Sequence, residues 1–314
     1  MKRCMGCMRE YGEQNDKCPA CGFSAEEMRK NPDIPEDILP LESVLSGRFI
    51  IGRPLSCSDY SFVYLAWDGV LRRRVAIREY FPRQLAVRKE DELVQPRNPK
   101  CQGLFEKGLE AFVQEAQKLH RNQDLEEPVN IYRVLEENNT AYTVMEYIKG
   151  ETVADFLERG EKVEDNVTVQ LLGAVKRLHD RGIAHFNLSS DNVFIDEDGR
   201  IRLLDFGVAR WKLYELSGGR IGTFQEEYMA PELLARKNPQ MNADLYSVGV
   251  IGYEIHTGRF LWLEPKMRKK KYLKTGDRDT DIIVSLLTEK DAGKRPKTAG
   301  DILEMLENRA RGRK

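Results

Sequence analysis

The order of strand-like and helix-like segments constrains the fold of this chain more than any other feature. Short β-branched and aromatic runs, "RFIIGRPL", "SFVYLAWDG" and "RRVAIREYF", follow one another from Arg48 and are separated by turn residues. Such runs predict an antiparallel sheet. Beyond Gly150 the pattern becomes helical, with "TVADFLERG", "NVTVQLLGAVKRLHDRG", "DLYSVGVIGYEIHTG" and "TAGDILEMLENRARG". Strands first and helices later predict an α+β fold with two lobes.

A helix and two more strands are predicted between these two parts. In "LFEKGLEAFVQEAQKLH" the apolar residues recur at helical spacing, so we expect one buried face and one charged face. The residues of the buried face are Leu104, Phe105, Leu109, Phe112, Ala116 and Leu119. The strand candidates are "VNIYRVLEEN" and "TAYTVMEYI", and a short β segment, "VFIDEDGRIRLLDFG", interrupts the later helices.

Composition excludes several classes of protein. The chain has 314 residues, and its 50 Lys+Arg against 51 Asp+Glu give a formal net charge of -1. No global field would draw such a chain onto nucleic acid, so we expect no nucleic-acid partner. No stretch approaches the roughly 18 consecutive apolar residues of a membrane helix, and the start, "MKRCMGCMRE", lacks an apolar signal core. We therefore expect a cytoplasmic protein.

The first 23 residues carry two pairs of cysteines. Cys4 and Cys7 form one Cys-x-x-Cys pair, and Cys18 and Cys21 form the other. Four thiolates in two tight turns can close a tetrahedron around Zn²⁺, and they leave no open position for catalysis. A structural zinc ribbon over residues 1–23 is thus favoured over a redox pair or two disulfides. Residues 24–46 carry three prolines among acidic residues and are interpreted as a linker.

A series of short motifs follows in a fixed order: "VAIR", "HFNLSSDN", "DFG" and "APE". Through these motifs residues 48 to about 308 resemble the protein kinase superfamily. The ribbon, the linker, "GRFIIGRPL" and "REYFP" make the chain similar to bacterial zinc-ribbon serine/threonine kinases. The resemblance implies a bilobal kinase-like domain over 47–308, divided near 147 into a β-rich N-lobe and a helical C-lobe, with a basic tail at 309–314.

The motifs implied for the N-lobe depart from the family pattern. Arg78 of "VAIR" stands where the resemblance implies a phosphate-binding lysine, with Glu115 as the helix glutamate that orients it. Serines occupy all three positions of the phosphate-binding glycines, namely Ser56, Ser58 and Ser61. Each serine adds a Cβ that disfavours the glycine conformation, so we expect degraded phosphate binding. The alternative that their hydroxyls replace the lost contacts stays open. The resemblance places the adenine-binding hinge at Met145, Glu146 and Ile148.

The catalytic loop departs further. Where the family has an aspartate that accepts the substrate proton, this chain has Asn187, whose neutral amide has almost no basicity. Ser189 replaces the loop lysine, and Phe186 replaces an arginine through which an activation-loop phosphate orders the site. Asp191 is a weaker candidate for a replacement base.

The two magnesium ligands implied by the resemblance are present. Asp205 of "DFG" and Asn192 could still hold Mg²⁺, so ATP and Mg²⁺ remain as weak ligands, although both residues could serve local hydrogen bonding alone. The scaffold motifs also match, with Glu232 of "APE" expected to pair with Arg295, and Asp244 expected to brace the catalytic loop.

Two further features of the sequence are possible phosphorylation sites and a run of basic residues. Ser217 and Thr223 could accept phosphate from another kinase, although ordinary loop residues are the favoured interpretation. Residues 266–274 contain six basic residues, which favour a solvated loop and leave an acidic protein partner or anionic surface as the alternative. These residues are Lys266, Arg268, Lys269, Lys270, Lys271 and Lys274.

The sequence thus predicts a catalytically impaired kinase homologue, a pseudokinase, that acts as a scaffold or allosteric partner of other proteins, such as a kinase or a kinase substrate. One alternative is a slow or atypical ATP-dependent kinase or phosphotransferase that uses the same site. A second alternative is an interaction module in which the zinc ribbon carries the function.

Overall fold

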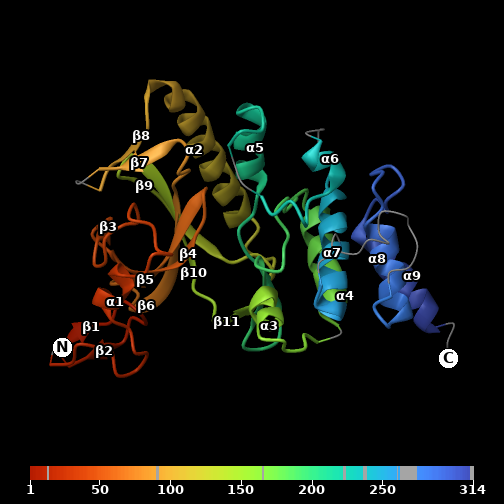
Figure 1. Ribbon diagram of the computed structural model, residues 1–314, viewed down its shortest axis with the longest axis horizontal. Coiled ribbons are helices and arrows are strands. Elements are labelled where there is room, and N and C mark those ends of the chain that lie inside the picture. Colours follow the sequence, from red (N-terminus) through yellow and green to blue (C-terminus); the bar gives the residue numbers. More distant parts are fainter. Residues whose placement is uncertain are drawn as a thin grey trace. The chain divides into compact units, whose positions relative to one another are not determined.

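The chain divides into two compact units. The computed structural model describes residues 1–12, 14–89, 92–164, 166–221, 224–235, 239–259, 261 and 274–311. Unit 1 comprises Met1–Gln123, Val129–Ile148 and Lys212–Thr223, and unit 2 comprises Asp124–Pro128, Lys149–Trp211 and Phe224–Lys314 (Figure 1). Among the described residues, no helix is both long enough and apolar enough to cross a lipid bilayer.

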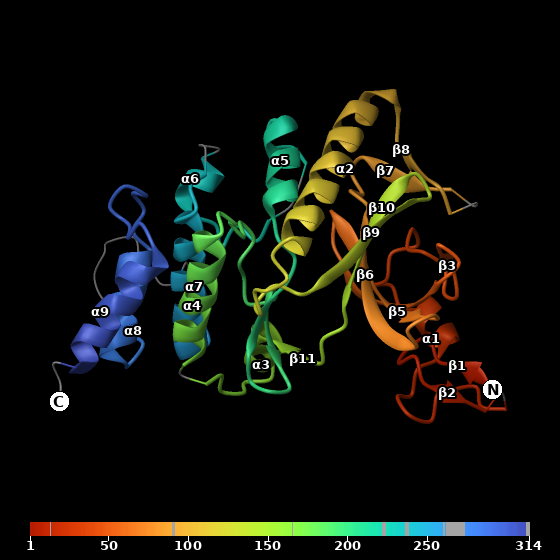
Figure 2. The same cartoon turned by 180° about the vertical axis from the view of Figure 1, so that it is seen from behind.

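Unit 1 is built on a six-stranded antiparallel sheet, which confirms the predicted β-rich N-lobe (Figure 2). The strand order is β3-β4-β5-β6-β10-β9. The three runs predicted from Arg48 onward are β4, β5 and β6, and the two later candidates are β9 and β10. The bounds are β3 Val44–Leu45, β4 Phe49–Cys57, β5 Ser61–Asp68, β6 Arg73–Tyr80, β9 Ile131–Glu137 and β10 Thr140–Glu146.

The long helix of unit 1 is α2, Pro99–His120. It begins earlier than the apolar pattern predicts, because the Asn98 side chain caps the amide of Lys100 at 3.0 Å. Its buried side contains Phe105, Phe112, Ala116 and Leu119, as predicted, and also Gly108 and Glu115. Leu104 and Leu109, which were also predicted for this face, are half-buried. A Cβ on Gly108 would collide with the Tyr80 hydroxyl, so the glycine allows the helix to approach the sheet. An additional hairpin, β7 Ala86–Arg88 with β8 Val94–Pro96, was not predicted.

The amino-terminal ribbon belongs to unit 1 and packs on its sheet. Two short strands, β1 Lys2–Arg3 and β2 Glu10–Tyr11, pair antiparallel. Met5 and Met8 are buried in one cluster with Leu65 of β5. The Arg53 amide of β4 donates a hydrogen bond to the main-chain oxygen of Met5 at 2.8 Å. The ribbon is therefore attached to the sheet by main-chain and apolar contacts, in addition to its covalent connection through residues 24–46.

The segment predicted as a linker is also ordered against unit 1. It contains the short helix α1, Ala25–Arg29, and the strand β3. Leu39 is fully buried, and its amide donates to the Tyr64 hydroxyl at 3.0 Å. The composition of residues 24–46 indicated a spacer, but these contacts give much of it a fixed place.

The "REYFP" run explains how this segment is held. Glu79 is fully buried, and its carboxylate accepts hydrogen bonds from Tyr64 at 2.8 Å and from Arg88 at 2.7 Å. Burial raises the pKa of Glu79 despite the favourable charge of Arg88. The Arg88 Nε atom also donates to the main-chain oxygen of Asp37 at 2.9 Å. One buried ion pair thus joins β6, β7 and the linker.

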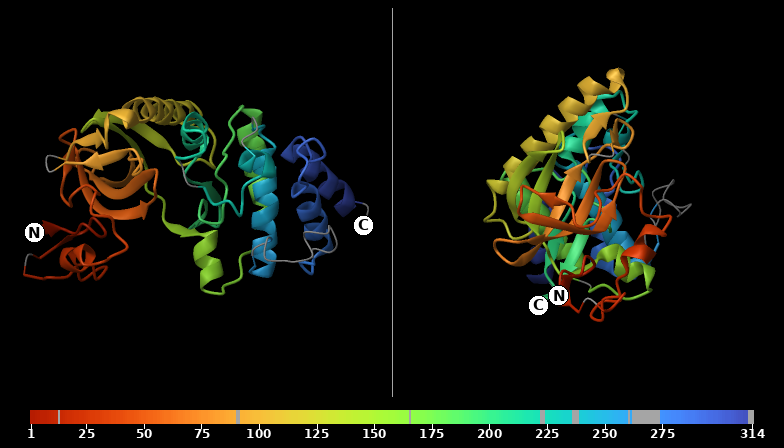
Figure 3. Two further views of the ribbon diagram at one scale, coloured as in Figure 1. Left: turned by 45° about the horizontal axis from the view of Figure 1, so that its top comes forward. Right: turned by 90° about the vertical axis from the view of Figure 1, so that its left-hand side faces the viewer.

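Unit 2 is mainly helical, as predicted (Figure 3). Unit 2 also contains a three-stranded antiparallel sheet with the strand order β11-β12-β13. Helix α7 is almost entirely buried and contacts α4 and α8. The bounds are β11 Gly150–Thr152, β12 Val193–Asp196, β13 Ile201–Leu203, α3 Val153–Glu158, α4 Val167–Asp180, α6 Pro231–Leu234, α7 Ala243–Thr257, α8 Arg278–Leu287 and α9 Ala299–Arg311. Helix α5, Val208–Leu216, begins in unit 2 and ends in unit 1.

Candidate functional site

The arginine that replaces the expected lysine is engaged inside unit 1. Arg78 lies on β6 and is only 8% exposed. Its NH1 donates to the Glu115 carboxylate of α2 at 3.3 Å, and its Nε donates to the Ser61 hydroxyl at 3.2 Å. The guanidinium also lies 5.6 Å from the Tyr60 ring and 5.2 Å from the Phe112 ring. The expected ion pair between positions 78 and 115 is thus present. The Arg78 guanidinium is, however, bound by Glu115 and Ser61 of the protein itself.

The serine-rich loop between β4 and β5 is closed by its own hydroxyl. The Ser58 Oγ atom accepts from the amides of Tyr60 at 3.3 Å and Ser61 at 3.0 Å, and it donates to the Ser61 main-chain oxygen at 2.9 Å. Ser56 is exposed on β4, opposite Val63. Two amides of this turn already have an acceptor, so the loop as it stands does not offer them to a phosphate.

The expected hinge residues lie at the end of β10. Met145, Glu146 and Ile148 are all half-buried. The Glu146 carboxylate accepts from the Asn130 side chain at 3.0 Å, and its amide donates to the Asn130 main-chain oxygen at 2.9 Å. These contacts fix the strand end without involving the main chain beyond Glu146.

In unit 2, Asn187, the residue at the base position, is hydrogen-bonded to Asp205, the aspartate of "DFG". Asn187 Nδ2 donates to the main-chain oxygen of Asp205 at 2.9 Å and to its carboxylate Oδ2 at 3.0 Å. The nitrogen is assigned to this side because a carboxylate only accepts. An aspartate at position 187 would have no N–H to donate and would set a second carboxylate beside Asp205. The amide therefore has a structural partner that the sequence did not reveal.

Arg210 of α5 binds the same carboxylate. Its NH2 lies 2.7 Å from Asp205 Oδ2, and the side chain is almost fully buried. Asn192, the second expected metal ligand, donates through Nδ2 to the main-chain oxygen of Asn187 at 2.7 Å. Sequence reasoning missed Arg210, because nothing in the pattern around it predicts that it turns back onto a residue five positions earlier.

These contacts decide whether the residues fit a magnesium nucleotide. A guanidinium already balances the charge of Asp205, and the amides of Tyr60 and Ser61 already bind Ser58. A divalent cation on Asp205 would have to displace Arg210 or share the carboxylate with it. As described, Asp205 in unit 2 does not fit Mg²⁺, and the turn at Ser58 in unit 1 does not fit the phosphates of ATP.

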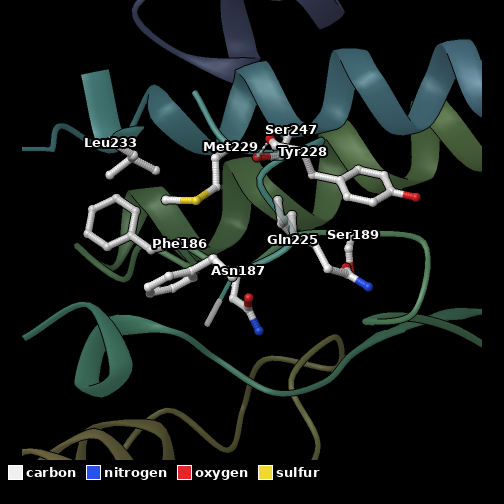
Figure 4. A pocket seen from close by; sticks show the side chains of 10 residues that line it. Phe186, Asn187, Ser189, Gln225, Tyr228, Met229, Leu233 and Ser247 are labelled. Carbon is white, nitrogen blue, oxygen red and sulfur yellow. Dashed lines mark hydrogen bonds between the residues drawn. The ribbon is translucent and has the colours of Figure 1, made fainter. Parts of the chain in front are cut away.

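Ser189 lies beside a hollow that is too small for a substrate side chain. The hollow has a volume of about 10 Å³, close to that of a single water molecule. Figure 4 shows its lining from the loop that carries Asn187, from α6 and the segment before it, and from α7. Ser189 is buried, and Asp191 accepts from the Gln225 side chain at 2.5 Å. The lining residues are Phe186, Asn187, Leu188, Ser189, Phe224, Gln225, Tyr228, Met229, Leu233 and Ser247.

The two scaffold interactions expected from the motifs are present in unit 2. The Asp244 carboxylate accepts from the amides of His185 at 2.8 Å and Phe186 at 2.7 Å, and it lies 2.9 Å from His179 Nε2. It therefore holds Phe186 in a left-handed conformation, with φ of 57°. Arg295 pairs with Glu232 at 2.6 and 3.0 Å.

Of the possible phosphorylation sites and the basic run, the structure describes Ser217 and Lys274. Ser217 is buried, and its hydroxyl donates to the Tyr214 main-chain oxygen at 2.9 Å and accepts from the Ile221 amide at 3.0 Å. This supports its interpretation as a structural residue. Thr223 lies outside the described residues, as does the basic run apart from Lys274, which is exposed.

The four paired cysteines come together in the ribbon. The sulfurs of Cys4, Cys7, Cys18 and Cys21 all lie within 4.8 Å of one another. The Cys4–Cys21 and Cys7–Cys18 sulfur distances are 3.6 and 3.9 Å. A tetrahedron with Zn–S bonds of about 2.3 Å has edges of about 3.8 Å, so small shifts of the sulfurs would let the donor set hold Zn²⁺.

The fold and these motifs define the class of protein. The family described as the protein kinase domain matches residues 93–309. The chain therefore belongs to the protein kinase family.

Individual relatives agree with this assignment. The serine/threonine-protein kinase pkn2 of Myxococcus xanthus is 31% identical over 298 residues, covering 86% of this chain and 33% of that protein. The probable serine/threonine-protein kinase PknB of Bifidobacterium longum is 27% identical, covering 69% of this chain and 31% of that protein. This chain thus spans about a third of the length of both relatives. A solved structure, the PpkA-294 apo form, has a TM-score of 0.72 at 24% identity, covers 86% of this chain and all of its own, and supports the fold.

Proposed function

We propose that this protein is a catalytically impaired serine/threonine kinase homologue, a pseudokinase, that acts as a scaffold or allosteric partner for other proteins. The observation that carries the proposal is the hydrogen bonding of Asn187 to Asp205. The residue at the base position is a neutral amide, and its N–H group points at the carboxylate that would bind a metal ion. Such a residue cannot accept the proton of a substrate hydroxyl.

The expected loss of rate is large. Removing a general base alone lowers a rate by about 10²–10⁴. The engagement of Arg78 and the closed turn at Ser58 act on the same transition state, through phosphate positioning. The separate losses need not add, because the groups of one site work as a unit. The names of the relatives support a kinase ancestry, while these departures favour a role without efficient phosphotransfer.

Nucleotide binding tests the site directly. At about 1 mM Mg²⁺–ATP, we expect the melting temperature of the wild-type protein to rise by about 1 °C or less. In Arg210→Ala, which removes the competing guanidinium from the Asp205 carboxylate, affinity should increase by about tenfold, and the rise should reach about 3 °C. Differential scanning fluorimetry with and without Mg²⁺ measures both.

The matched control is Arg200→Ala, which removes the same charge from an exposed turn of unit 2 and should behave as the wild type. A rise above about 5 °C in the wild-type protein would contradict the degraded site. Equal shifts in Arg210→Ala and Arg200→Ala would contradict the competition between Arg210 and the metal ion.

A slow kinase is the second candidate, and one observation favours it. Asp205 and Asn192, the two side chains expected to hold Mg²⁺, are both retained in unit 2. A slow kinase would transfer phosphate in a Mg²⁺-dependent manner, and the transfer would disappear in Asp205→Ala.

The zinc and the partners belong to the same proposal. We propose that the four cysteines hold a structural zinc ion and that the partner is a protein, such as a kinase or a kinase substrate. A role for the ribbon as an independent module is less well supported, because Met5 and Met8 are buried in one cluster with Leu65 of the sheet. For the basic run at 266–274, a solvated loop stays the favoured prediction, and a contact with an acidic partner stays the alternative.

A further inference from the structure

A hollow lined by arginines lies where the ribbon meets the turn between β5 and β6. Its volume is about 390 Å³, and all of its lining residues belong to unit 1. Residues about sixty positions apart in the sequence meet here. The lining residues are Arg3, Met8, Arg9, Glu10, Trp67, Arg72 and Arg74.

The floor of the hollow is fixed by packing. The Arg3 guanidinium lies 3.9 Å from the Trp67 ring centroid. It donates hydrogen bonds to the Met8 main-chain oxygen at 2.7 Å and to the Glu10 carboxylate at 2.5 Å. Met8 itself is buried beside Leu65. The Arg3 guanidinium is therefore engaged by groups of unit 1. Together with the Trp67 indole on which it lies, it forms the base of the hollow.

The wall is fixed by the sheet. Arg74 pairs with Trp67 across β5 and β6, and Arg72 lies in the connecting turn with φ of 51°. The Arg53 side chain of β4 donates to the Gly6 main-chain oxygen at 3.1 Å, and a Cβ on Gly52 would collide with Met5 and Met8. The ribbon is thus seated closely on the sheet, and both sides of the hollow keep their positions.

The charge of the rim is strongly positive. Arg9 and Arg72 are exposed and Arg74 is half-buried. Among the described residues that line the hollow, the single carboxylate is that of Glu10, and it already binds Arg3. Exposed guanidinium groups present planar pairs of donors that match carboxylates, and they are weakly hydrated compared with an ammonium group.

We infer that this hollow binds an acidic peptide segment of a partner protein. Its carboxylates would pair with Arg9, Arg72 and Arg74, while an apolar side chain would pack on the half-buried Trp67. The volume suits one or two side chains, and arginines around an aromatic centre are typical of sites that carry most of a binding energy. This inference rests on the proposed function in one respect, namely that the partner is a protein.

The test uses the full-length, zinc-loaded protein and a defined probe. The probe is a fluorescein-labelled peptide of glutamates around one leucine, and its counterpart has glutamines in place of the glutamates. Fluorescence anisotropy at low salt should detect binding of the acidic peptide, at least tenfold tighter than that of the neutral one. Raising the ionic strength should weaken binding, because the rim is exposed to solvent.

Three charge reversals locate the site. Arg9→Glu, Arg72→Glu and Arg74→Glu should each weaken binding of the acidic peptide by about fivefold or more. Arg133→Glu is the matched control, since Arg133 is exposed on β9 of the same sheet and does not line the hollow. This variant should bind as the wild type does. Melting temperature and zinc content should be equal in all four variants.

Other results would overturn the inference. They are equal binding of the acidic and neutral peptides, equal weakening by Arg133→Glu and by the three reversals, or tighter binding of single-stranded DNA of the same length than of the acidic peptide. None of these results bears on phosphotransfer, so failure here is distinguishable from failure of the proposed function.

Discussion

Removing the metal from the ribbon is expected to lower the melting temperature of the protein by about 5–10 °C. Residues 1–23 bury Met5 and Met8 on the sheet of unit 1, and such a short segment has too few apolar residues for a core of its own. Each buried methionine contributes about 1.5–3 kcal/mol, so undocking of the ribbon removes several kcal/mol. A chelator, or the substitution Cys18→Ser, should therefore expose Leu65 and the surface around it.

The zinc prediction is checked by elemental analysis and scanning fluorimetry on the same samples. We expect one zinc ion per wild-type chain and a clear loss of zinc and stability in Cys18→Ser. The matched control is Cys57→Ser, because Cys57 is exposed and lies outside the four-cysteine cluster. A metal-free wild-type protein, or equal melting temperatures for the two variants, would contradict the structural role of zinc.

Replacing Asp244 by alanine is expected to destabilise the protein by about 3–5 kcal/mol. The carboxylate is 1% exposed and accepts from the amides of His185 and Phe186. Alanine leaves two amides without their acceptor, and it releases the left-handed backbone at Phe186. The loop that carries Asn187 should then lose its fixed place.

Urea unfolding monitored by circular dichroism measures this effect. Glu304→Ala is the control, since Glu304 is exposed on α9, and its cost should stay within about 0.5 kcal/mol. A cost below about 1 kcal/mol for Asp244→Ala would mean that other contacts brace the loop.

The strands and the long helix could be predicted because their patterns are regular. β4, β5 and β6 have β-branched and aromatic residues between clear turns, and α2 places its apolar residues at helical spacing. Helix α5 was covered only by the general expectation that the chain after the short β segment is helical, and its own residues give no helical pattern. Its buried apolar residues are Ala209, Trp211 and Leu213, an alternation typical of a strand, and Val208 and Leu216 are exposed. Tertiary contacts decide its structure.

The candidate site was predictable in its residue types but not in its contacts. The sequence identified the replacements at 78, 187 and the three serines. It left open whether serine hydroxyls replace the glycine contacts with phosphate, and the structure turns Ser58 inward onto its own turn. The contact of Arg210 with Asp205 depends on the path of α5, so it could not be predicted before the position of that helix was known.

The arginine-lined hollow illustrates a different limit. The ribbon sequence offers only Lys2, Arg3 and Arg9 as basic residues at its start, which did not indicate a binding surface. The seating of the ribbon on β4 and β5 adds Arg72 from a distant turn and Arg74 from β6. Separation along the chain hides such a surface until the packing is known.

The most direct test of the account is a phosphotransfer measurement with radiolabelled ATP, Mg²⁺ and a generic protein substrate. The wild-type protein, its Asp205→Ala variant and the kinase domain of pkn2 from Myxococcus xanthus are compared side by side. Because Asn187 cannot accept a proton, the wild-type rate is expected to lie at least about 100-fold below that of pkn2 and to equal that of Asp205→Ala. A rate comparable with that of pkn2, abolished by Asp205→Ala, would contradict the account.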